Sequence, residues 1–226
     1  MKKISLAIFD LDGTILDSNG VWDDIDRRFL DSINEPWDEE FAKMVAQSDY
    51  HKAAVYTINR YHLETTPEAL MKHWEDMAFE AYRERVKLKE GVDEVIKWLH
   101  QKDIPLVLAT LAPEVLYEPA LERLGLLGYF SHLTSANRDG FTKETPEIYH
   151  YLCRKFHAKE EETLSFEDSL VAMQSMHKAG LISVGIKDFR NYKNEHDFRA
   201  ISPFYYDWPE VRSHLIEKDY QPHFRM

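Results

Sequence analysis

The sequence contains little cysteine and no long hydrophobic run. Its single cysteine, Cys153, has no partner for a disulfide within the chain, and no histidine or aspartate is arranged beside it as a catalytic set. It lies in the helix-like pattern IYHYLCRKF, so we expect it to pack inside a helix. The first apolar run, ISLAIF, stops at Asp10 and is too short for a signal-peptide core or a membrane span. We therefore expect a cytoplasmic protein with no membrane partner.

Positive charge is also scarce. The 226 residues include 28 Lys and Arg against 40 Asp and Glu, which gives a formal net charge of −12. The attraction to phosphate that drives sequence-independent nucleic-acid binding is therefore missing in bulk. A hydrophobic content of 44%, with 13% aromatic residues, is enough to bury a sizeable core in one large or two small domains. We expect a globular protein that does not bind nucleic acid.

Strand and helix patterns alternate through most of the chain. Residues 3–9 form a short apolar run bounded by Asp and Gly, which is typical of a strand buried on both faces. After Gly91, strands are predicted at 104–110, 132–136, 163–166 and 181–186, separated by helices at 92–102, 113–125, 146–156 and 170–180. This alternation favours right-handed crossovers and a parallel sheet covered on both faces. The predicted fold class is α/β, with a doubly wound parallel sheet.

The stretch between the first two of these strands has a different pattern. The segments VWDDIDRRFLDSI and PEALMKHWEDMAFEAYRERV carry apolar residues at spacings of three and four, as amphipathic helices do. Pro36 and Pro67 fit first-turn positions of such helices, and Thr66 is a candidate N-cap. No strand is predicted between Val21 and Lys89. The predicted organisation is an α/β core of residues 1–16 plus 90–226, into which a helical domain of residues 17–89 is inserted.

The last part of the chain is less regular. The segment DFRNYKNEHDF, which follows Lys187, is polar and is predicted to be a loop. PFYYD is a candidate edge strand, although Pro203 weakens that prediction. WPEVRSHLIEK is predicted to be the last helix.

Polar residues follow several of the predicted strands. The stretch AIFDLDGTILDS ends a strand on two carboxylates, LVLAT ends on a threonine, and TLSF runs into FEDS. Ligands of open parallel sheets bind outside the carboxyl ends of the strands, so these groups are expected to converge. Each of them alone also fits an ordinary role in a turn, a strand end or a helix N-cap, but together they favour a site. The candidate residues are Asp10, Asp12, Thr110, Lys143, Glu167 and Asp168.

Such a set suits phosphate chemistry. Clustered carboxylates repel one another unless a cation enters, and Mg²⁺ prefers oxygen ligands together with a substrate phosphate. Lys143, the Thr110 hydroxyl and backbone N–H groups near Gly13 are suitable partners for phosphoryl oxygens. With a metal offsetting the repulsion, the Asp10 carboxylate can attack phosphorus and form an aspartyl-phosphate. Asp12 is then placed to act as acid and later as base.

The same motifs carry a family resemblance. DLDGT, LVLAT, TKETPEIY with its Lys143, and FEDS resemble, in order, the four motifs of the haloacid dehalogenase (HAD) superfamily of aspartate-nucleophile phosphohydrolases. The helical insert resembles the type I helical cap of that superfamily, so the resemblance covers the whole chain. It implies a Rossmann-like HAD core and Mg²⁺-dependent hydrolysis of a small phosphorylated metabolite.

The resemblance also implies a role for each candidate residue. Asp10 would be the nucleophile and a side-chain metal ligand, and Asp12 the acid/base, binding the metal through its backbone carbonyl. Thr110 and Lys143 would hold the phosphoryl oxygens. Asp168, together with Glu167, would complete the metal site. An aspartate at position 12 occurs in the phosphatases and mutases of the superfamily and not in its dehalogenases.

Three residues depart from the pattern of the superfamily. Leu111 stands where a polar residue is frequent, so one substrate hydrogen bond is expected to be missing. Glu144 replaces a common proline and is expected to draw off part of the charge of Lys143. Ala172 replaces a frequent glycine, which a helix start tolerates. Together they indicate an atypical member.

The insert is expected to select the leaving group of the substrate. Candidate residues lie at 19–22 and 47–51. Residues 17–40 contain nine acids against two arginines, a formal charge of −7. This segment would repel a polyanionic substrate if it borders the entrance, and is otherwise a solvated helix face. His51, His62 and His73 are expected to be packing or surface residues, since no acidic partners define a metal set.

The sequence thus predicts a Mg²⁺-dependent phosphatase. A phosphosugar mutase of the same superfamily is the enzymatic alternative. A degenerate member kept for binding or regulation is the alternative of another class, and the completeness of the candidate site argues against it. The sequence leaves open whether the protein is a monomer or a homodimer.

Overall fold

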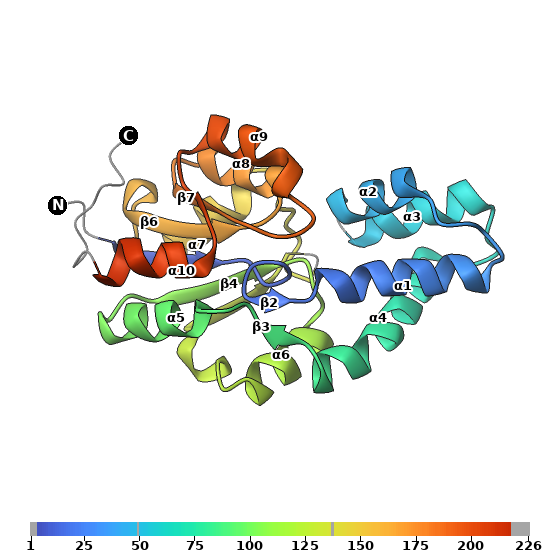
Figure 1. The fold of residues 1–226 in the computed structure, drawn as a ribbon, viewed down its shortest axis with the longest axis horizontal. Helices are drawn as coiled ribbons and strands as arrows, with labels where there is room; N and C mark the ends of the chain where they lie inside the picture. Colours follow the sequence, from blue (N-terminus) through green and yellow to red (C-terminus); the bar gives the residue numbers. More distant parts are fainter. Residues whose placement is uncertain (1–3, 49, 137, 218–226) are drawn as a thin grey trace.

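The computed structural model describes residues 4–48, 50–136 and 138–217. Within this part of the chain, six strands form a parallel sheet with helices on both faces, and a group of four helices lies beside one edge of this core (Figure 1). The predicted α/β fold with a doubly wound parallel sheet is confirmed.

The order of the strands explains where a site can form. Along the sheet the order is β5-β4-β1-β6-β7-β8, so the chain winds from β1 first to one side and then to the other. β1 lies between β4 and β6, with Phe9 opposite Leu108 on one side and Phe166 on the other. This reversal is the switch point at which open α/β sheets bind ligands. The strands are β1 (Leu6–Phe9), β4 (Leu106–Thr110), β5 (His132–Ser135), β6 (Thr163–Glu167), β7 (Ile182–Ile186) and β8 (Tyr205–Tyr206).

Alternate residues of the strands supply two separate cores. In β1, Ala7 and Phe9 pack in the cluster that includes residues of α5, α6 and α10, whereas Leu6 and Ile8 pack with residues of α7, α8 and α9. Because both faces are covered, the strands are apolar throughout, as the sequence indicated. The flanking helices are α5 (Val92–Gln101), α6 (Glu114–Arg123), α7 (Glu147–Lys155), α8 (Leu170–Lys178), α9 (Glu195–Ile201) and α10 (Trp208–Arg212).

The insert leaves and rejoins the core at one place. Leu16 pairs with Leu88 and Asp17 with Lys87, which forms a short antiparallel ribbon of β2 (Leu16–Asp17) and β3 (Lys87–Leu88). The prediction that no strand occurs before Lys89 was therefore wrong for β3, because two residues are too few to show a periodicity. Between these strands lie α1 (Asn19–Ser32), α2 (Glu39–Gln47), α3 (Tyr50–Tyr61) and α4 (Pro67–Glu84).

The two predicted helix starts in the insert have different outcomes. Pro67 is the first residue of α4, and the Thr66 hydroxyl accepts a hydrogen bond from the Ala69 N–H at 3.3 Å. Pro36, in contrast, lies before α2, which begins at Glu39. Asp38 is its N-cap and accepts hydrogen bonds from two backbone N–H groups, at 2.9 and 3.1 Å. A carboxylate at the N-cap accepts hydrogen bonds from the first backbone N–H groups of the helix, which a proline side chain cannot do.

The end of the chain is more regular than predicted. The segment expected to be a polar loop contains α9, because acidic Glu195 and Asp197 stand in its first turn and Phe198 is buried against the sheet. The candidate edge strand is confirmed as β8, which begins two residues after Pro203. α10 covers the start of the predicted last helix, a π-helical turn continues to residue 217, and residue 218 lies outside the described residues.

The remaining residues singled out in the sequence have structural positions. Cys153 is buried in α7, as expected, with its sulfur 3.5 Å from the Thr163 hydroxyl. His51, His62 and His73 are exposed. None of the helices in the described ranges combines the length and the apolar character needed to cross a membrane.

Gly185 of β7 provides a test of this packing. A Cβ at this position would lie 2.6 Å from Phe198 Cδ1 and 3.0 Å from Tyr205 Cδ2, and both rings are fully buried. We expect Gly185→Ala to lower the free energy of unfolding by about 1–3 kcal/mol through overpacking, as measured by urea unfolding. Gly128→Ala is the matched control, since no atom lies within 4 Å of the added carbon. Equal losses in the two variants would contradict the packing described for α9.

Candidate active site

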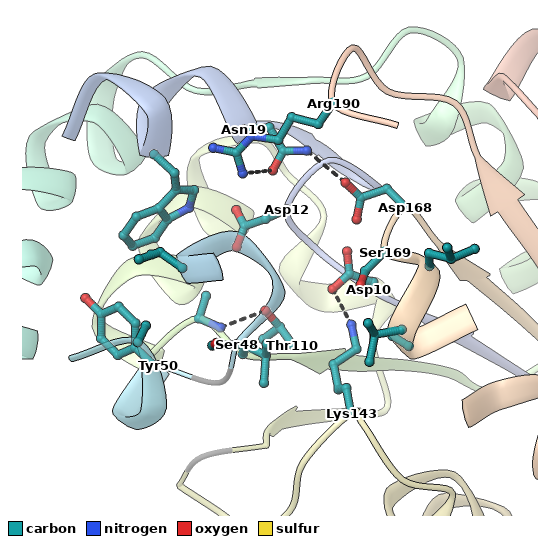
Figure 2. A pocket seen from close by; sticks show the side chains of 18 of the residues that line it. Asp10, Asp12, Asn19, Ser48, Tyr50, Thr110, Lys143, Asp168, Ser169 and Arg190 are labelled. Atoms are coloured by element: carbon teal, nitrogen blue, oxygen red, sulfur yellow. Dashed lines mark hydrogen bonds and ion pairs between the residues drawn. The ribbon is translucent and has the colours of Figure 1, made fainter. Parts of the chain in front are cut away.

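The predicted site residues meet at the carboxyl edge of the sheet. Asp10 follows β1 directly, Thr110 is the last residue of β4, and Glu167 ends β6 with Asp168 next to it. They line a cavity of about 410 Å³ between this edge and the helical insert (Figure 2). The cavity is lined by all six predicted site residues, including Lys143.

Lys143 binds two of the carboxylates. Its Nζ lies 2.6 Å from Asp10 Oδ1 and 2.5 Å from Glu167 Oε2, and the lysine is only 6% exposed. Burial alone would lower the pKa of Lys143, but the two carboxylates raise it well above its usual range. The lysine therefore stays charged in the interior and joins the carboxylates at the ends of β1 and β6.

One lysine does not balance the acidic cluster. Asp10, Glu167 and Asp168 each place a carboxylate oxygen within 4.8 Å of the others. Burial, and next the charge of Asp10, raise the pKa of Glu167 to about 7 and that of Asp168 well above its usual range. Asp10 Oδ2 is buried and has no hydrogen-bond partner among the described residues. A cluster of hard oxygen donors with an unpartnered oxygen fits a metal cation.

Asp12 lies apart from this cluster and faces the insert (Figure 2). Its Oδ1 accepts hydrogen bonds from the Ser18 hydroxyl at 2.5 Å and from the Tyr82 hydroxyl, which itself accepts from Trp22 Nε1. Burial raises the pKa of Asp12 to about 6, although the two hydroxyl donors oppose the shift. The two aspartates thus have different surroundings, and the pKa of Asp12 is suited to giving and taking protons near neutral pH.

Thr110 lies between the two aspartates in the cavity wall. It is 1% exposed, and its hydroxyl oxygen accepts a hydrogen bond from the Ala112 N–H at 3.0 Å. A hydroxyl that accepts in this way keeps its hydrogen for an acceptor inside the cavity.

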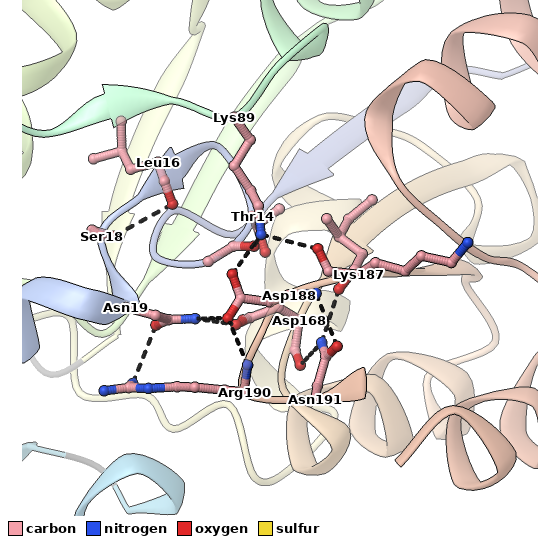
Figure 3. Close-up of polar contacts among 12 residues, drawn as sticks. Thr14, Leu16, Ser18, Asn19, Lys89, Asp168, Lys187, Asp188, Arg190 and Asn191 are labelled. Carbon is pink, nitrogen blue, oxygen red and sulfur yellow. Dashed lines mark hydrogen bonds and ion pairs between the residues drawn. The ribbon is translucent and has the colours of Figure 1, made fainter. Parts of the chain in front are cut away.

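A polar network behind Asp168 was missed in the sequence. Asn19 Nδ2 donates to Asp168 Oδ2 at 2.8 Å and to Asp188 Oδ1 at 2.9 Å, and Asp188 also binds Lys89 Nζ at 2.5 Å (Figure 3). Asn191 donates to the Asp168 carbonyl at 2.8 Å. These groups hold the Asp168 carboxylate in place. Asp188 follows β7, so the strand-end argument used for the other residues would have found it.

Gly13 allows the two carboxylate loops to approach. Its φ is +74°, and a Cβ on it would lie 2.0 Å from Asp168 Oδ2 and 2.2 Å from Asn19 Nδ2. Only glycine fits both the backbone conformation and this contact.

The three departures from the superfamily pattern have specific surroundings. Glu144 does not draw on Lys143 as expected. It binds Lys52 of α3 instead, with both carboxylate oxygens 2.9 Å from Nζ, and so links the insert to the core. Leu111 and Ala172 line the cavity as apolar residues.

The insert supplies the opposite wall of the cavity. Trp22, Ser48 and Tyr50 belong to the segments expected to select the substrate and line the cavity. Residue 49 and the side chain of residue 47 lie outside the described part of the chain. Of the acidic segment, Asp23 and Asp26 reach the cavity, whereas Asp24 is exposed. The acidic segment is thus partly a cavity wall and partly a solvated face.

Asp26 should make stability depend on pH. Burial raises its pKa from 3.8 to about 7 in the folded protein, so the folded state binds this proton more tightly than the unfolded state. Ionisation of the buried Asp26 lowers the free energy of unfolding. This loss of stability is absent below about pH 4, grows as the pH rises to 7 and stays constant at higher pH. We expect Asp26→Asn to be more stable than the wild type at pH 8 by about 1–4 kcal/mol, with a smaller difference at pH 5, in urea unfolding.

Asp24→Asn is the control for that measurement, because it removes the same charge from an exposed position of α1. It should lack the gain in stability at pH 8 that is expected for Asp26→Asn, because it removes no buried charge. If the wild type were more stable than Asp26→Asn at pH 8, ionisation of the Asp26 carboxylate would not destabilise the folded protein, and the prediction would be wrong.

Comparison with known proteins agrees with this geometry. A sequence model of haloacid dehalogenase-like hydrolases matches residues 4–180. The chain is 25% identical over 175 residues to a phosphorylated carbohydrates phosphatase of Thermotoga maritima, covering 77% of this chain and 81% of that protein. It is 25% identical over 189 residues to a validoxylamine A 7'-phosphate phosphatase of Streptomyces hygroscopicus subsp. limoneus, covering 80% and 84%. A solved β-phosphoglucomutase from Clostridium difficile shares the fold, with a TM-score of 0.78 and 16% identity over 98% of this chain and 99% of that one. The chain belongs to the haloacid dehalogenase-like hydrolases.

Proposed function

We propose that this hydrolase is a Mg²⁺-dependent phosphatase that removes the phosphoryl group of a small phosphorylated metabolite through an aspartyl-phosphate. The observation that carries the proposal is the cluster of Asp10, Glu167 and Asp168 at the sheet edge, with buried Lys143 against it. The related chains named as phosphatases of phosphorylated carbohydrates and of validoxylamine A 7'-phosphate support it.

The residues around Asp10 suit a divalent cation. Asp10, Asp168 and Glu167 would hold Mg²⁺, together with the backbone carbonyl of Asp12. When bound, the ion would neutralise part of the phosphate charge and so lower the repulsion between phosphate and carboxylate. The unpartnered Asp10 Oδ2 supports this assignment, because it is free to bind a cation. The raised pKa values of Glu167 and Asp168 support it as well, because they indicate that these carboxylates are buried close to other negative charges, which a bound cation would offset.

The chain's own side chains supply the nucleophile and the proton donor and acceptor for the bond changes. The Asp10 carboxylate forms a bond to phosphorus while the bond from phosphorus to the alcohol oxygen breaks, and Asp12 gives its proton to that oxygen. Lys143 and the Thr110 hydroxyl hold the phosphoryl oxygens during the transfer. Asp12 then takes a proton from the water that attacks phosphorus, which releases phosphate and restores Asp10. The pKa of about 6 at Asp12 supports both of its roles.

Residues 17–89 are proposed to act as a cap that selects the leaving group. Trp22, Tyr50 and Trp74 line the cavity from the insert, opposite the carboxylates of the core. The ion pair between Lys52 and Glu144 connects the cap to the loop that carries Lys143. The alcohol of the substrate therefore meets the cap while its phosphate meets the core.

Release of inorganic phosphate from a panel of phosphate esters tests this function. We expect turnover with Mg²⁺, none in excess EDTA, and recovery when Mg²⁺ is added back. Asp10→Asn should lose about three decades in kcat or more, since an amide cannot replace the attacking carboxylate.

The panel also separates the alternatives. A phosphosugar mutase would convert a sugar phosphate into its isomer with little net phosphate release, and a binding protein would do neither. Full activity after dialysis against EDTA, or near-normal turnover by Asp10→Asn, would contradict the proposal.

The separate role of Asp12 is tested by the leaving group. A phenolate departs without much help from an acid, whereas an alkoxide needs the proton. With an aryl phosphate, Asp12→Ala should therefore phosphorylate Asp10 but hydrolyse the intermediate slowly, giving a burst of phenol. Peptide mass spectrometry after an acid quench should find one added phosphoryl group on the peptide that contains Asp10.

An alkyl phosphate is the matched substrate for that experiment. It should fail at the first step with Asp12→Ala and leave no adduct. Steady phenol release at the wild-type rate without an adduct would exclude Asp12 as the acid/base.

A further inference from the structure

Asp26 is a buried carboxylate without a partner in the wall of the cavity. It belongs to α1, is 6% exposed and lines the cavity from the cap side. No hydrogen bond or ion pair joins it to any other residue in the described part of the chain. Burying an ionised carboxylate in this way is costly unless a partner is supplied.

No cationic side chain of the surrounding elements forms a hydrogen bond or an ion pair with the Asp26 carboxylate in the described part of the chain. Arg190, from the loop after β7, lies near enough to favour the ionised form of Asp26. Its guanidinium is bound elsewhere, however, because Nε and Nη2 donate to Asp23 and Nη1 donates to Asn19 at 3.2 Å. Lys43, from α2, is exposed at the cavity. Asp23 thus has a hydrogen-bonded cation, whereas no cation among the described residues is hydrogen-bonded to the Asp26 carboxylate.

Aromatic rings line the same cap wall. Trp22 precedes Asp26 by one helical turn on the same face of α1. The Tyr50 ring lies 6.0 Å from that of Trp22 and 5.7 Å from that of Trp74, between centroids. Asp26 lies near Tyr50, since its charge is one of the causes that raise the pKa of that phenol.

The polar atoms of Tyr50 and Trp22 are committed away from Asp26, whereas Trp74 Nε1 is buried and has no hydrogen-bond partner among the described residues. The Tyr50 hydroxyl donates to the Met71 carbonyl at 3.1 Å, and Trp22 Nε1 donates to the Tyr82 hydroxyl at 2.8 Å. The groups that Trp22 and Tyr50 have left to interact with a ligand in the cavity are therefore their rings, whose faces carry negative electrostatic potential and attract cations. A carboxylate and several aromatic faces are complementary to an organic ammonium group.

We propose that the cap wall formed by Asp26, Trp22, Tyr50 and Trp74 binds a protonated amine on the leaving group, so that the preferred substrates are phosphate monoesters of amino alcohols. This inference rests on the proposed phosphatase function and names its substrate class. The phosphate is held by the core and the ammonium by Asp26. An additional anionic group on the leaving alcohol is disfavoured by the same carboxylate.

A series of esters that differ only at one end tests the proposal. The probes are straight-chain alkyl phosphates of two to six carbons that end in an ammonium, a hydroxyl or a methyl group. With Mg²⁺, we expect the best ammonium ester to exceed its hydroxyl and methyl counterparts at least about tenfold in kcat/KM, the scale of a charged hydrogen bond. Equal values for the three ends, or a preference for hydroxyl, would overturn the proposal.

Two variants of α1 test whether the preference for the ammonium ester depends on Asp26. Asp26→Asn should lower the ratio of kcat/KM for the ammonium ester to kcat/KM for the methyl ester about 10- to 100-fold. Asp24→Asn removes the same charge from an exposed position and should change neither ester. Retention of the full ammonium preference in Asp26→Asn would overturn the assignment. Because that variant is expected to be the more stable one, misfolding does not confuse the result.

A binding experiment keeps this proposal separate from the phosphatase function. The Asp10→Asn protein with Mg²⁺ binds the three esters without turning them over, and titration calorimetry measures their Kd values. Tighter binding of the ammonium ester, lost in Asp10→Asn/Asp26→Asn, supports the ammonium site even if the wild type hydrolyses no ester. Equal Kd values exclude the site even if the wild type hydrolyses all of them.

Discussion

The contact of Lys143 with Asp10 and Glu167 is the interaction on which the rest of the site depends. A buried ammonium between two carboxylates joins the connection after β5 to the ends of β1 and β6, which are neighbours in the sheet. Removing one member of such a group leaves an uncompensated buried charge, at a cost of about 3–5 kcal/mol. The position of Asp10, the proposed nucleophile, and the charge balance of the cluster therefore both depend on this lysine.

The sequence predicted which side chains meet at the carboxyl edge of the sheet, because the signal there is local. Apolar runs that stop at Asp10, Thr110 and Glu167 mark strand ends, and parallel strands bring their ends together whatever the loops do. α9 could not be predicted in this way. Phe198 is buried because Gly185, in a distant strand, has no side chain, and a polar sequence gives no sign of that contact.

The network around Asp188 shows a second limit of prediction. Asn19 and Lys89 lie at the two junctions between core and insert, and both bind Asp188. Their amide and ammonium groups have no spacing pattern in the sequence, since the residues are brought together only when the insert folds back. The ion pair of Glu144 with Lys52 could likewise not be predicted from the sequence, because Lys52 belongs to the insert and meets Glu144 only in the folded protein.

The ribbon of β2 and β3 affects how easily the length of the insert can change during evolution. Since Leu16 and Leu88 are paired, the two ends of the insert are held together at the core whatever the length of the chain between them. Loop closure entropy grows only with the logarithm of length, about 0.6 kcal/mol for each doubling. Exchanging the insert for a shorter or longer one is thus thermodynamically cheap. With the proposed division of roles, the insert that meets the alcohol can change in length while the core residues that meet the phosphate keep their places.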